Sequence, residues 1–382
     1  MQEQAADRVG GPQLIAWHHH NGTQTSAEEY LKSYQQVLLN GLSHTKLIYL
    51  DTNYWVSLRK AELGEGSANE RNLLTTLRGM VRAREAICVS HFHSLIELGR
   101  QEQSSLRVTA NLLDELTEGV AVISPLDLQT WDCIQFISVT LGIHVDNLHT
   151  SWTKIGQIHS QELPQNMPGS ISDMGRNVVR KSLVDTLWNM TFAEIFDTFR
   201  WDTKAAFGPS LEADAVSQVE SLKRKRQCNE NQTREQIRRA NFAESVTEQL
   251  KAIFARLLLA WHIKNSTSSA VSIVREQLQH LLDAATRRFN ERSLGNLLPS
   301  VAVPVELYAL YETAPESRHL TANDWVDWSH AAAALPYCDV FFTERHLAHQ
   351  LRQELRADQQ FECIVAGTLA DAVKELRSGR VR

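Results

Sequence analysis

The chain has 382 residues, which is too long for one ordinary compact domain and predicts either two units or one domain with a large insertion. Hydrophobic residues make up 43% and charged residues 22%, so a sizeable core is expected and wholesale disorder is excluded. The formal net charge of -6 does not mark a general nucleic-acid binder, so such a role would depend on local basic patches.

Five scattered cysteines without a CxxC pair argue against a disulfide framework and against a structural zinc module. The N-terminus lacks a basic segment followed by an apolar one, and no stretch offers about 18 uninterrupted apolar residues. We therefore expect reduced thiols, no contact with a membrane and a location in the cytoplasm.

Residues 1–45 are predicted to form an N-terminal extension. Its polar stretch contains His18, His19 and His20, which either bind a metal or lie in a solvated loop, and we favour the loop. The segment SAEEYLKSYQQVLLNG predicts a short helix with Ser26 as N-cap and Gly41 past its end.

Residues 46–104 alternate between strands and helices. The apolar run LIYLD predicts a buried parallel strand that ends at Asp51, and AICVS predicts a second. The segment HFHSLIELGRQ continues as a helix whose apolar stripe is interrupted by Glu97. The remaining helices of this part are expected at 53–62 and 68–84.

Residues 105–320 are dominated by helical periodicity, with VAVISP as the one further strand that the pattern predicts there. Residues 321–382 return to alternation, with strands at DVFFT and ECIVA and helices at 323–335, 345–356 and 368–377. Strands that alternate with helices pair in parallel through right-handed crossovers. The sequence thus predicts an α/β core that a large, mainly helical insertion divides in two, so we favour one domain with an insertion.

Sites in such sheets lie at the carboxyl ends of the strands, where the connecting loops converge. Asp51 closes the first strand, and Asn53 follows it in LDTNYW. Asp51 is either a site carboxylate or the cap of the next helix. Glu97 lies in an apolar stripe, where a buried carboxylate needs a cation, a metal or a route to solvent.

The segment TANDWVDWSHAAAALPYCDVFFTERHL carries further acids. Asp324 and Asp327 are three residues apart and share one helix face, before a run of alanines that lets the helix approach the sheet. Asp324 also has the spacing of a capping box with Thr321, whereas Asp327 has no such local role. Convergent carboxylates suit Mg²⁺ or Mn²⁺, and such sites hydrolyse phosphodiesters.

This ordered set resembles the PIN domain family of metal-dependent nucleases: an Asp after the first strand, a Glu on an early helix, an Asp opening a small-residue helix, and a Thr ending the next strand. The matching residues are Asp51, Glu97, Asp327 and Thr343. The resemblance covers residues 45–104 and 320–382. It implies a three-layer α/β/α fold and a nuclease that usually cuts RNA. With the polar residues described above, we expect Asp51, Glu97, Asp327 and Asp324 to hold the metal and Asn53 and Thr343 to lie near the substrate.

Many members of the family carry an Asp two residues after the threonine, where this chain has Arg345. Glu344 is the expected substitute as the fourth catalytic acid. Asp339 competes for that role but begins the same strand, about 13 Å from Thr343 at the usual rise per residue, so it is discounted.

Residues 221–240 carry seven basic side chains against two acidic ones. This excess suits contact with a phosphate backbone and equally suits a solvated helix face. The residues of this segment that we expect to contact RNA are Lys223, Arg224, Lys225 and Arg226.

The interpretation from the sequence is therefore a cytoplasmic, metal-dependent endoribonuclease. Its restraint by a protein inhibitor, a partner or the insertion stays open, as does its oligomeric state. The main alternative is an inactive PIN-like binding or scaffold protein that works through the insertion. The segment REQLQH, from Arg275 to His280, superficially resembles the Arg-x4-His signature of HEPN ribonucleases. Dinucleotide-binding, P-loop and α/β-hydrolase motifs are absent from the sequence.

Overall fold

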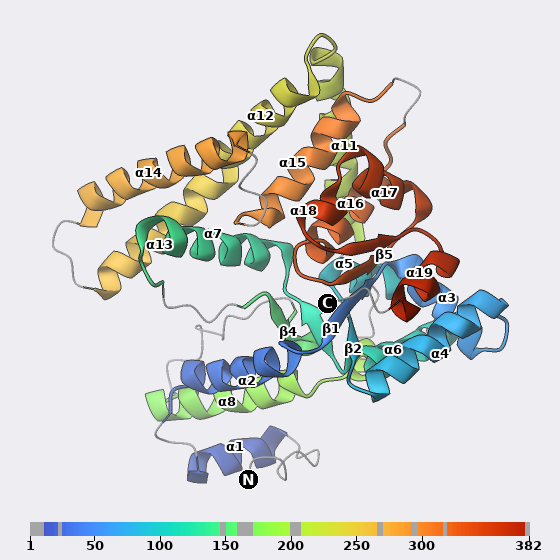
Figure 1. Cartoon of the computed structure of the whole chain (residues 1–382). Coiled ribbons are helices and arrows are strands. Elements are labelled where there is room, and N and C mark those ends of the chain that lie inside the picture. Colours follow the sequence, from blue (N-terminus) through green and yellow to red (C-terminus); the bar gives the residue numbers. More distant parts are fainter. Residues whose placement is uncertain are drawn as a thin grey trace.

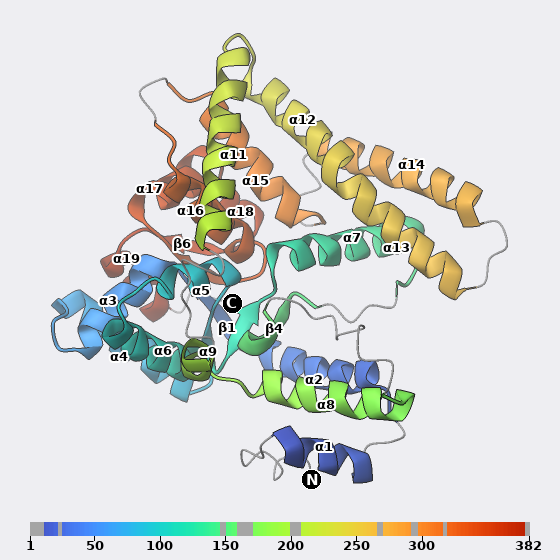
Figure 2. The ribbon, with the colours of Figure 1, turned by 180° about the vertical axis from the view of Figure 1, so that it is seen from behind.

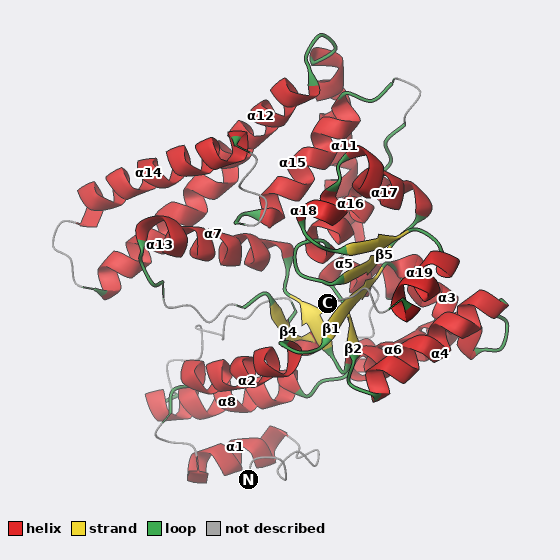
Figure 3. Ribbon diagram, viewed as in Figure 1, coloured by secondary structure: helices red, strands yellow, loops and turns green. Residues whose placement is uncertain are grey.

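The computed structural model of the protein describes residues 11–21, 25–145, 150–158, 171–198, 208–265, 270–291, 297–315 and 319–378. A parallel sheet of four strands lies at the centre and helices surround it (Figures 1 and 3). The strand order is β2-β1-β5-β6, with β1 at Lys46–Leu50, β2 at Ala86–Val89, β5 at Val340–Phe342 and β6 at Ile364–Ala366. The expectation of an α/β chain with a parallel sheet is confirmed.

The sheet joins two segments that are far apart in the sequence. Strand β1 pairs with β2 on one side and with β5 on the other, where Tyr49 lies opposite Phe341. A short antiparallel pair, β3 (Val120–Val122) and β4 (Trp152–Lys154), continues beyond β2. An isolated parallel bridge between Ser90 and Ala121 connects this pair to the main sheet.

Alternate side chains of the strands point to opposite faces, and helices cover both. Ile48 and Phe342 pack on one face, and Tyr49 and Phe341 pack on the other. The first face lies under α3 (Thr52–Glu62), α4 (Ala68–Arg82), α6 (Gln103–Thr117), α9 (Phe192–Thr198) and α19 (Leu369–Arg377). The second lies under α11 (Gly208–Cys228), α15 (Pro299–Glu312), α16 (Ala322–Ala334) and α17 (Arg345–His349), with the π-helix η3 (Gln350–Glu354) and α18 (Ala357–Gln360) following α17.

The predicted boundary between core and insertion at residues 104 and 105 separates elements that share one core. Leu113 and Leu116 of α6 are fully buried in the same cluster as Ile48 and Leu50 of β1. The strand predicted at VAVISP is β3, which extends the sheet beyond β2. The core of the first part therefore continues to about Val122, because an amphipathic helix after β2 can bury its apolar stripe only against the sheet.

A helical arm with its own core extends from the sheet (Figures 1 and 2). It contains α7 (Pro125–Leu141), α12 (Arg234–Ser245), the π-helix η2 (Val246–Leu250), α13 (Lys251–Lys264) and α14 (Ala270–Asn290). Its aromatic side chains pack inside, with the rings of Phe242 and Phe289 stacked at 3.9 Å between centroids. Arg275 and His280, which carry the HEPN-like spacing, are exposed on α14.

The N-terminal elements differ from the expectation in two respects. The histidine run lies in a helix, α1 (Gly11–Asn21), and His18 is buried against α8 (Asp173–Trp188), so the predicted solvated loop is wrong for it. A hydrogen bond of 2.7 Å between Nε2 of His18 and the Asp185 carboxylate gives the buried ring a polar partner. Helix α2 (Ala27–Leu42) follows, and its predicted N-cap, Ser26, is confirmed with a complete capping box. The second difference is that Gly41 lies inside this helix and not past its end.

The remaining elements are the 3-10 turn η1 (Ile155–Gln157) and the short helix α5 (Phe92–Leu98). Among the described residues, no helix combines the length and the apolar character that a membrane crossing requires. All five cysteines are free, and Cys228 is the exposed one.

Candidate functional site

The candidate site lies at the carboxyl ends of β1 and β5. The chain leaves β1 toward β2 on one side of the sheet and returns as β5 on the other, so the strand order reverses between these two strands. A crevice outside such a reversal is the usual ligand site of an open α/β sheet. Asp51 follows β1, and its backbone N–H donates to the carbonyl of Phe342 at 2.9 Å. This bond places Asp51 beside Thr343.

Asp51 occupies the N-cap position of α3, but its side chain makes no capping hydrogen bond. Its carboxylate is 1% exposed and accepts a hydrogen bond of 2.9 Å from the Thr343 hydroxyl. The alternative in which Asp51 serves as a helix cap is therefore wrong. The carboxylate faces the site and is held there by the residue that ends the neighbouring strand.

Glu97 reaches the same place from α5. Its Oε2 accepts two hydrogen bonds, one of 2.5 Å from the Thr52 hydroxyl and one of 2.9 Å from Nε2 of His330. Burial alone would raise the pKa of Glu97, but the bond and the charge of His330, with the Thr52 bond, keep that pKa below its usual range. Glu97 is thus ionised, and its orientation is fixed.

His330 is the positive group of the site, and it is fully buried on α16. Burial lowers its pKa, but Glu97, Asp51 and Asp327 together raise it to about 9. Both ring nitrogens of an imidazolium donate, so Nε2 donates to Glu97 while Nδ1 donates to the Tyr49 hydroxyl at 2.6 Å.

Asp327 is the acid with the least favourable surroundings. Burial and the negative charges of Asp51, Glu344 and Glu97 raise its pKa to about 8, against a smaller opposing effect of His330. Like charges that share a site disfavour one another's ionised form. Asp327 therefore retains its proton near neutral pH unless a cation joins the site.

Glu344 follows β5 and Thr343, as expected. It sits at the N-cap of α17 without a capping hydrogen bond from its side chain. Burial, followed by the charge of Asp51, raises its pKa; His346 opposes this increase, and the charge of Asp324 adds to it. Glu344 thus interacts electrostatically with Asp51, Asp324 and Asp327.

Asp324 has a second role. It completes the capping box of α16, where its Oδ2 accepts from the Thr321 backbone N–H at 2.7 Å and from the Thr321 hydroxyl at 2.6 Å. Asn53 is exposed on the first turn of α3. Asp339 accepts from the Leu47 N–H at the amino ends of the strands, on the opposite edge of the sheet.

The chemistry of the site follows from its charges. One ligand atom each of Asp51, Glu97 and His330 lies within 4.8 Å of the others. The carboxyl groups of Asp51, Glu97 and Asp327 interact with the His330 imidazolium, and that of Glu344 interacts with Asp51 and Asp327. A small divalent cation with oxygen ligands would balance this excess of negative charge.

The basic segment on α11 is largely engaged inside the protein. Lys223 pairs with Glu220 at 3.0 Å, and Lys225 pairs with Glu244. Arg226 donates to the Ala314 carbonyl at 2.8 Å and stacks over the Tyr311 ring. Arg224 donates to the backbone carbonyl one turn earlier at 3.3 Å. These contacts connect α11 to its neighbours and weaken the case for a free phosphate-binding surface.

The site residues predicted from the sequence do not include His330, although its position three residues after Asp327 puts both on one helix face. Two further histidines of the neighbourhood, His91 and His93, are buried. Both ring nitrogens of His91, and Nδ1 of His93, lack a hydrogen-bond partner among the described residues. Burial lowers the pKa of His91 well below the usual range and that of His93 to about 4, so both are neutral.

Comparisons of the chain with protein-family models, with curated proteins and with solved structures found no match.

Proposed function

We propose that this protein is a metal-dependent nuclease with a PIN-like, three-layer α/β/α core, and that it cuts RNA. The observation that carries the proposal is the convergence of Asp51, Glu97, Asp327 and Glu344 at the β1–β5 strand reversal. Burial, together with the negative charges of the neighbouring acids, raises the pKa of Asp327 to about 8. A protein has no structural reason to gather several repelling carboxylates in a buried place, whereas a divalent cation gives one.

Asp51, Glu97 and Asp327, with Glu344 beside them, would hold Mg²⁺ or Mn²⁺, because these ions favour carboxylate oxygen ligands. Such a cation lowers the pKa of an attacking water and stabilises negative charge on the leaving oxygen of a phosphodiester. The chain's own residues prepare the ligands: Thr343 holds Asp51, while Thr52 and His330 orient Glu97. Groups that fix ligands in this way usually matter for metal affinity.

The preference for RNA comes from the family that the motifs resemble. The second candidate, an inactive binding or scaffold protein, has one observation in its favour. The His330 imidazolium already balances one of the carboxylates, at 2.9 Å from Glu97. The two candidates differ in whether the remaining acids bind a cation and whether that cation supports cleavage.

The test is incubation of the purified full-length chain with Mn²⁺ or Mg²⁺ and end-labelled RNA and DNA of mixed sequence. We expect cleavage of RNA that EDTA and Asp51→Asn both abolish. Asp339→Asn is the matched control, because it makes the same chemical change at the opposite edge of the sheet and should retain activity. An absence of metal-dependent cleavage on all substrates, or equal losses in both variants, contradicts the proposal.

A further inference from the structure

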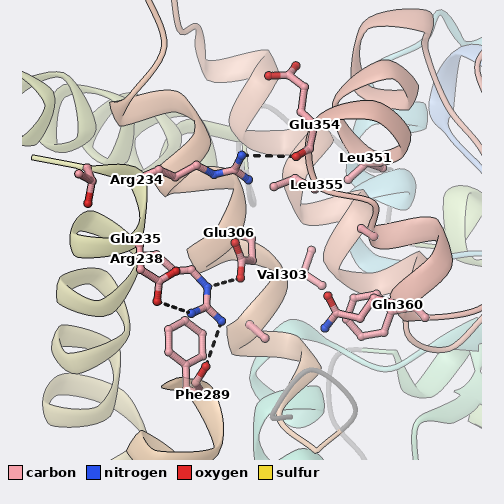
Figure 4. A pocket seen from close by; sticks show the side chains of 14 residues that line it. Arg234, Glu235, Arg238, Phe289, Val303, Glu306, Leu351, Glu354, Leu355 and Gln360 are labelled. Atoms are coloured by element: carbon pink, nitrogen blue, oxygen red, sulfur yellow. Dashed lines mark hydrogen bonds and ion pairs between the residues drawn. The ribbon is translucent and has the colours of Figure 1, made fainter. Parts of the chain in front are cut away.

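A pocket of about 400 Å³ lies apart from the carboxylates, between α12, α15 and the η3–α18 segment (Figure 4). It has the size of a site for a small molecule. Its wall includes the π-helix η3, and such helices occur frequently at functional sites. Arg356, which directly precedes α18, adopts a left-handed backbone at φ 54°, which is rare for a residue other than glycine.

One side of the pocket is a rigid polar wall. The buried Arg238 pairs with Glu306, and its guanidinium lies over the Phe289 ring at 3.8 Å and donates to the Phe289 carbonyl at 3.1 Å. Glu235 is a weaker partner at 3.4 Å. Arg238 is therefore committed within the protein, and it builds the wall without supplying a free charge.

Arg234 differs from Arg238 although the two lie one turn apart on α12. It is half-buried at the pocket, and its hydrogen bond to the Glu354 carbonyl is long at 3.4 Å. The Glu354 carboxylate points away from the pocket (Figure 4). A guanidinium has five N–H donors, so Arg234 can bind an anionic oxygen with most of them.

The rest of the pocket offers both apolar and polar surface. The partly exposed Leu355 and Phe361 supply the apolar surface, above the buried Val303 and Leu351. Gln360 lies on the side opposite Arg234 and brings an amide that both donates and accepts (Figure 4). A cation at one end, an apolar middle and an amide at the other end form a complementary surface for a ring with polar edges that carries an anionic group.

We propose that this pocket binds a small organic anion built on a heteroaromatic ring, of the chemical class of a nucleoside monophosphate. Arg234 would bind the anionic group, the apolar side chains would contact the ring, and Gln360 would bond to the polar edge of the ring. The proposal concerns binding alone and does not depend on nuclease activity.

The test is isothermal titration calorimetry of the full-length chain, with adenosine 5′-monophosphate, inorganic phosphate and adenosine as three separate probes. We expect saturable binding of the monophosphate, with lower affinity for phosphate and for adenosine, since each of these engages one end only. Arg234→Gln should weaken binding of the monophosphate about tenfold or more, because it removes a charge-assisted hydrogen bond. Gln360→Ala should weaken it about threefold and leave phosphate binding unchanged.

Arg239→Gln is the matched control. Arg239 lies on the same helix, pairs with Glu235 at 2.8 Å and is exposed outside the pocket lining. It should keep the affinity of the unmodified chain, and thermal unfolding verifies that all variants fold. Three results overturn the proposal: no saturable binding of the monophosphate at millimolar concentration, equal effects of Arg234→Gln and Arg239→Gln, or phosphate binding as tight as that of the monophosphate.

Discussion

Two buried clusters of this protein each combine aspartate with histidine, and they differ in how their charges are balanced. In the Asp185 cluster, one carboxylate accepts three hydrogen bonds, from Nε2 of His18 at 2.7 Å, from the Tyr30 hydroxyl at 2.7 Å and from the Tyr34 hydroxyl at 2.9 Å. In the carboxyl-edge site, which contains Asp51, Glu97, Asp327 and Glu344, the first three acids interact with His330, and Glu344 interacts with Asp51 and Asp327.

Burial of a carboxylate does not by itself indicate function. Asp185 satisfies its charge with donors from α1 and α2, so the cluster connects these helices to α8 and needs nothing more. The carboxyl-edge site keeps an excess of negative charge that its own residues do not balance. Burial alone does not indicate a ligand. A buried charge that the surrounding residues do not balance does.

The largest expected effect is the loss of RNA cleavage when the carboxyl-edge site is mutated. Glu97→Gln retains an oxygen that accepts from Thr52 but removes a ligand charge, so metal-dependent cleavage should fall about a thousandfold, which corresponds to about 4 kcal/mol. Single-turnover cleavage of labelled RNA measures it. Asp185→Asn should cleave at the unmodified rate, and a comparable loss in both variants would mean that the two clusters do not differ in role.

The second expected effect is a loss of stability of the protein when the Asp185 cluster is mutated. Asp185→Ala leaves His18, Tyr30 and Tyr34 without their buried acceptor, which should cost about 3 to 4 kcal/mol. Hydrogen exchange should become faster in α1 and α2, because these helices lose their connection to α8. Unchanged exchange in both helices would show that apolar packing alone holds them.

The third expected effect is a pH-dependent change in stability that comes from a third buried carboxylate, whose charge is only partly compensated. Asp132 accepts from the Ser300 N–H at 2.9 Å and from the Tyr337 hydroxyl at 2.8 Å, yet burial raises its pKa to about 6 from the ordinary 3.8. A raised carboxyl pKa contributes stability at pH values below about 4, and that contribution is lost as the pH rises through 6.

The loss amounts to about 3 kcal/mol between these limits. Urea unfolding at pH 4.5 and pH 7.5 measures it, and Asp132→Asn is compared with the unmodified chain so that other titrating groups cancel. The stability difference between the two proteins should change with pH in this window. A pH-independent difference would contradict the assignment of the shift to Asp132.

Much of the carboxyl-edge site could be predicted from the sequence, but the Asp185 cluster could not. Alternation of strands and helices placed Asp51, Thr343 and Glu344 after adjacent parallel strands, because the carboxyl ends of such strands share one edge. The capping box of Asp324 followed from local spacing alone. The Asp185 cluster could not be predicted, since His18 and Asp185 are 167 residues apart and no local pattern relates them. The same holds for Tyr49 and His330, whose contact depends on how α16 packs against the sheet.

The smallest expected effect is a gain of stability, whereas most substitutions make a protein less stable. Asp327→Asn replaces an acid whose ionised form is disfavoured by burial and by Asp51, so the metal-free protein should gain stability. We expect a gain on the order of 2 kcal/mol, well below the full equivalent of the pKa shift, because Asp327 is only partly buried and solvent screens its charge. Because the pKa of Asp327 is raised to about 8, the unmodified chain loses stability as the pH rises from about 4 to 8. The gain should therefore be larger at pH 8.5 than at pH 4.5. Thermal unfolding in EDTA measures it.

Addition of Mn²⁺ shows whether the stability change of Asp327→Asn comes from charge repulsion or from packing. A cation that balances the acids should raise the unfolding temperature of the unmodified chain more than that of Asp327→Asn, which reduces or reverses the gain. Asp185→Asn is the control with the opposite sign, because it weakens a balanced cluster. If Asp327→Asn destabilises the metal-free protein as Asp185→Asn does, then Asp327 is a structural carboxylate like Asp185, and the distinction between the two clusters fails.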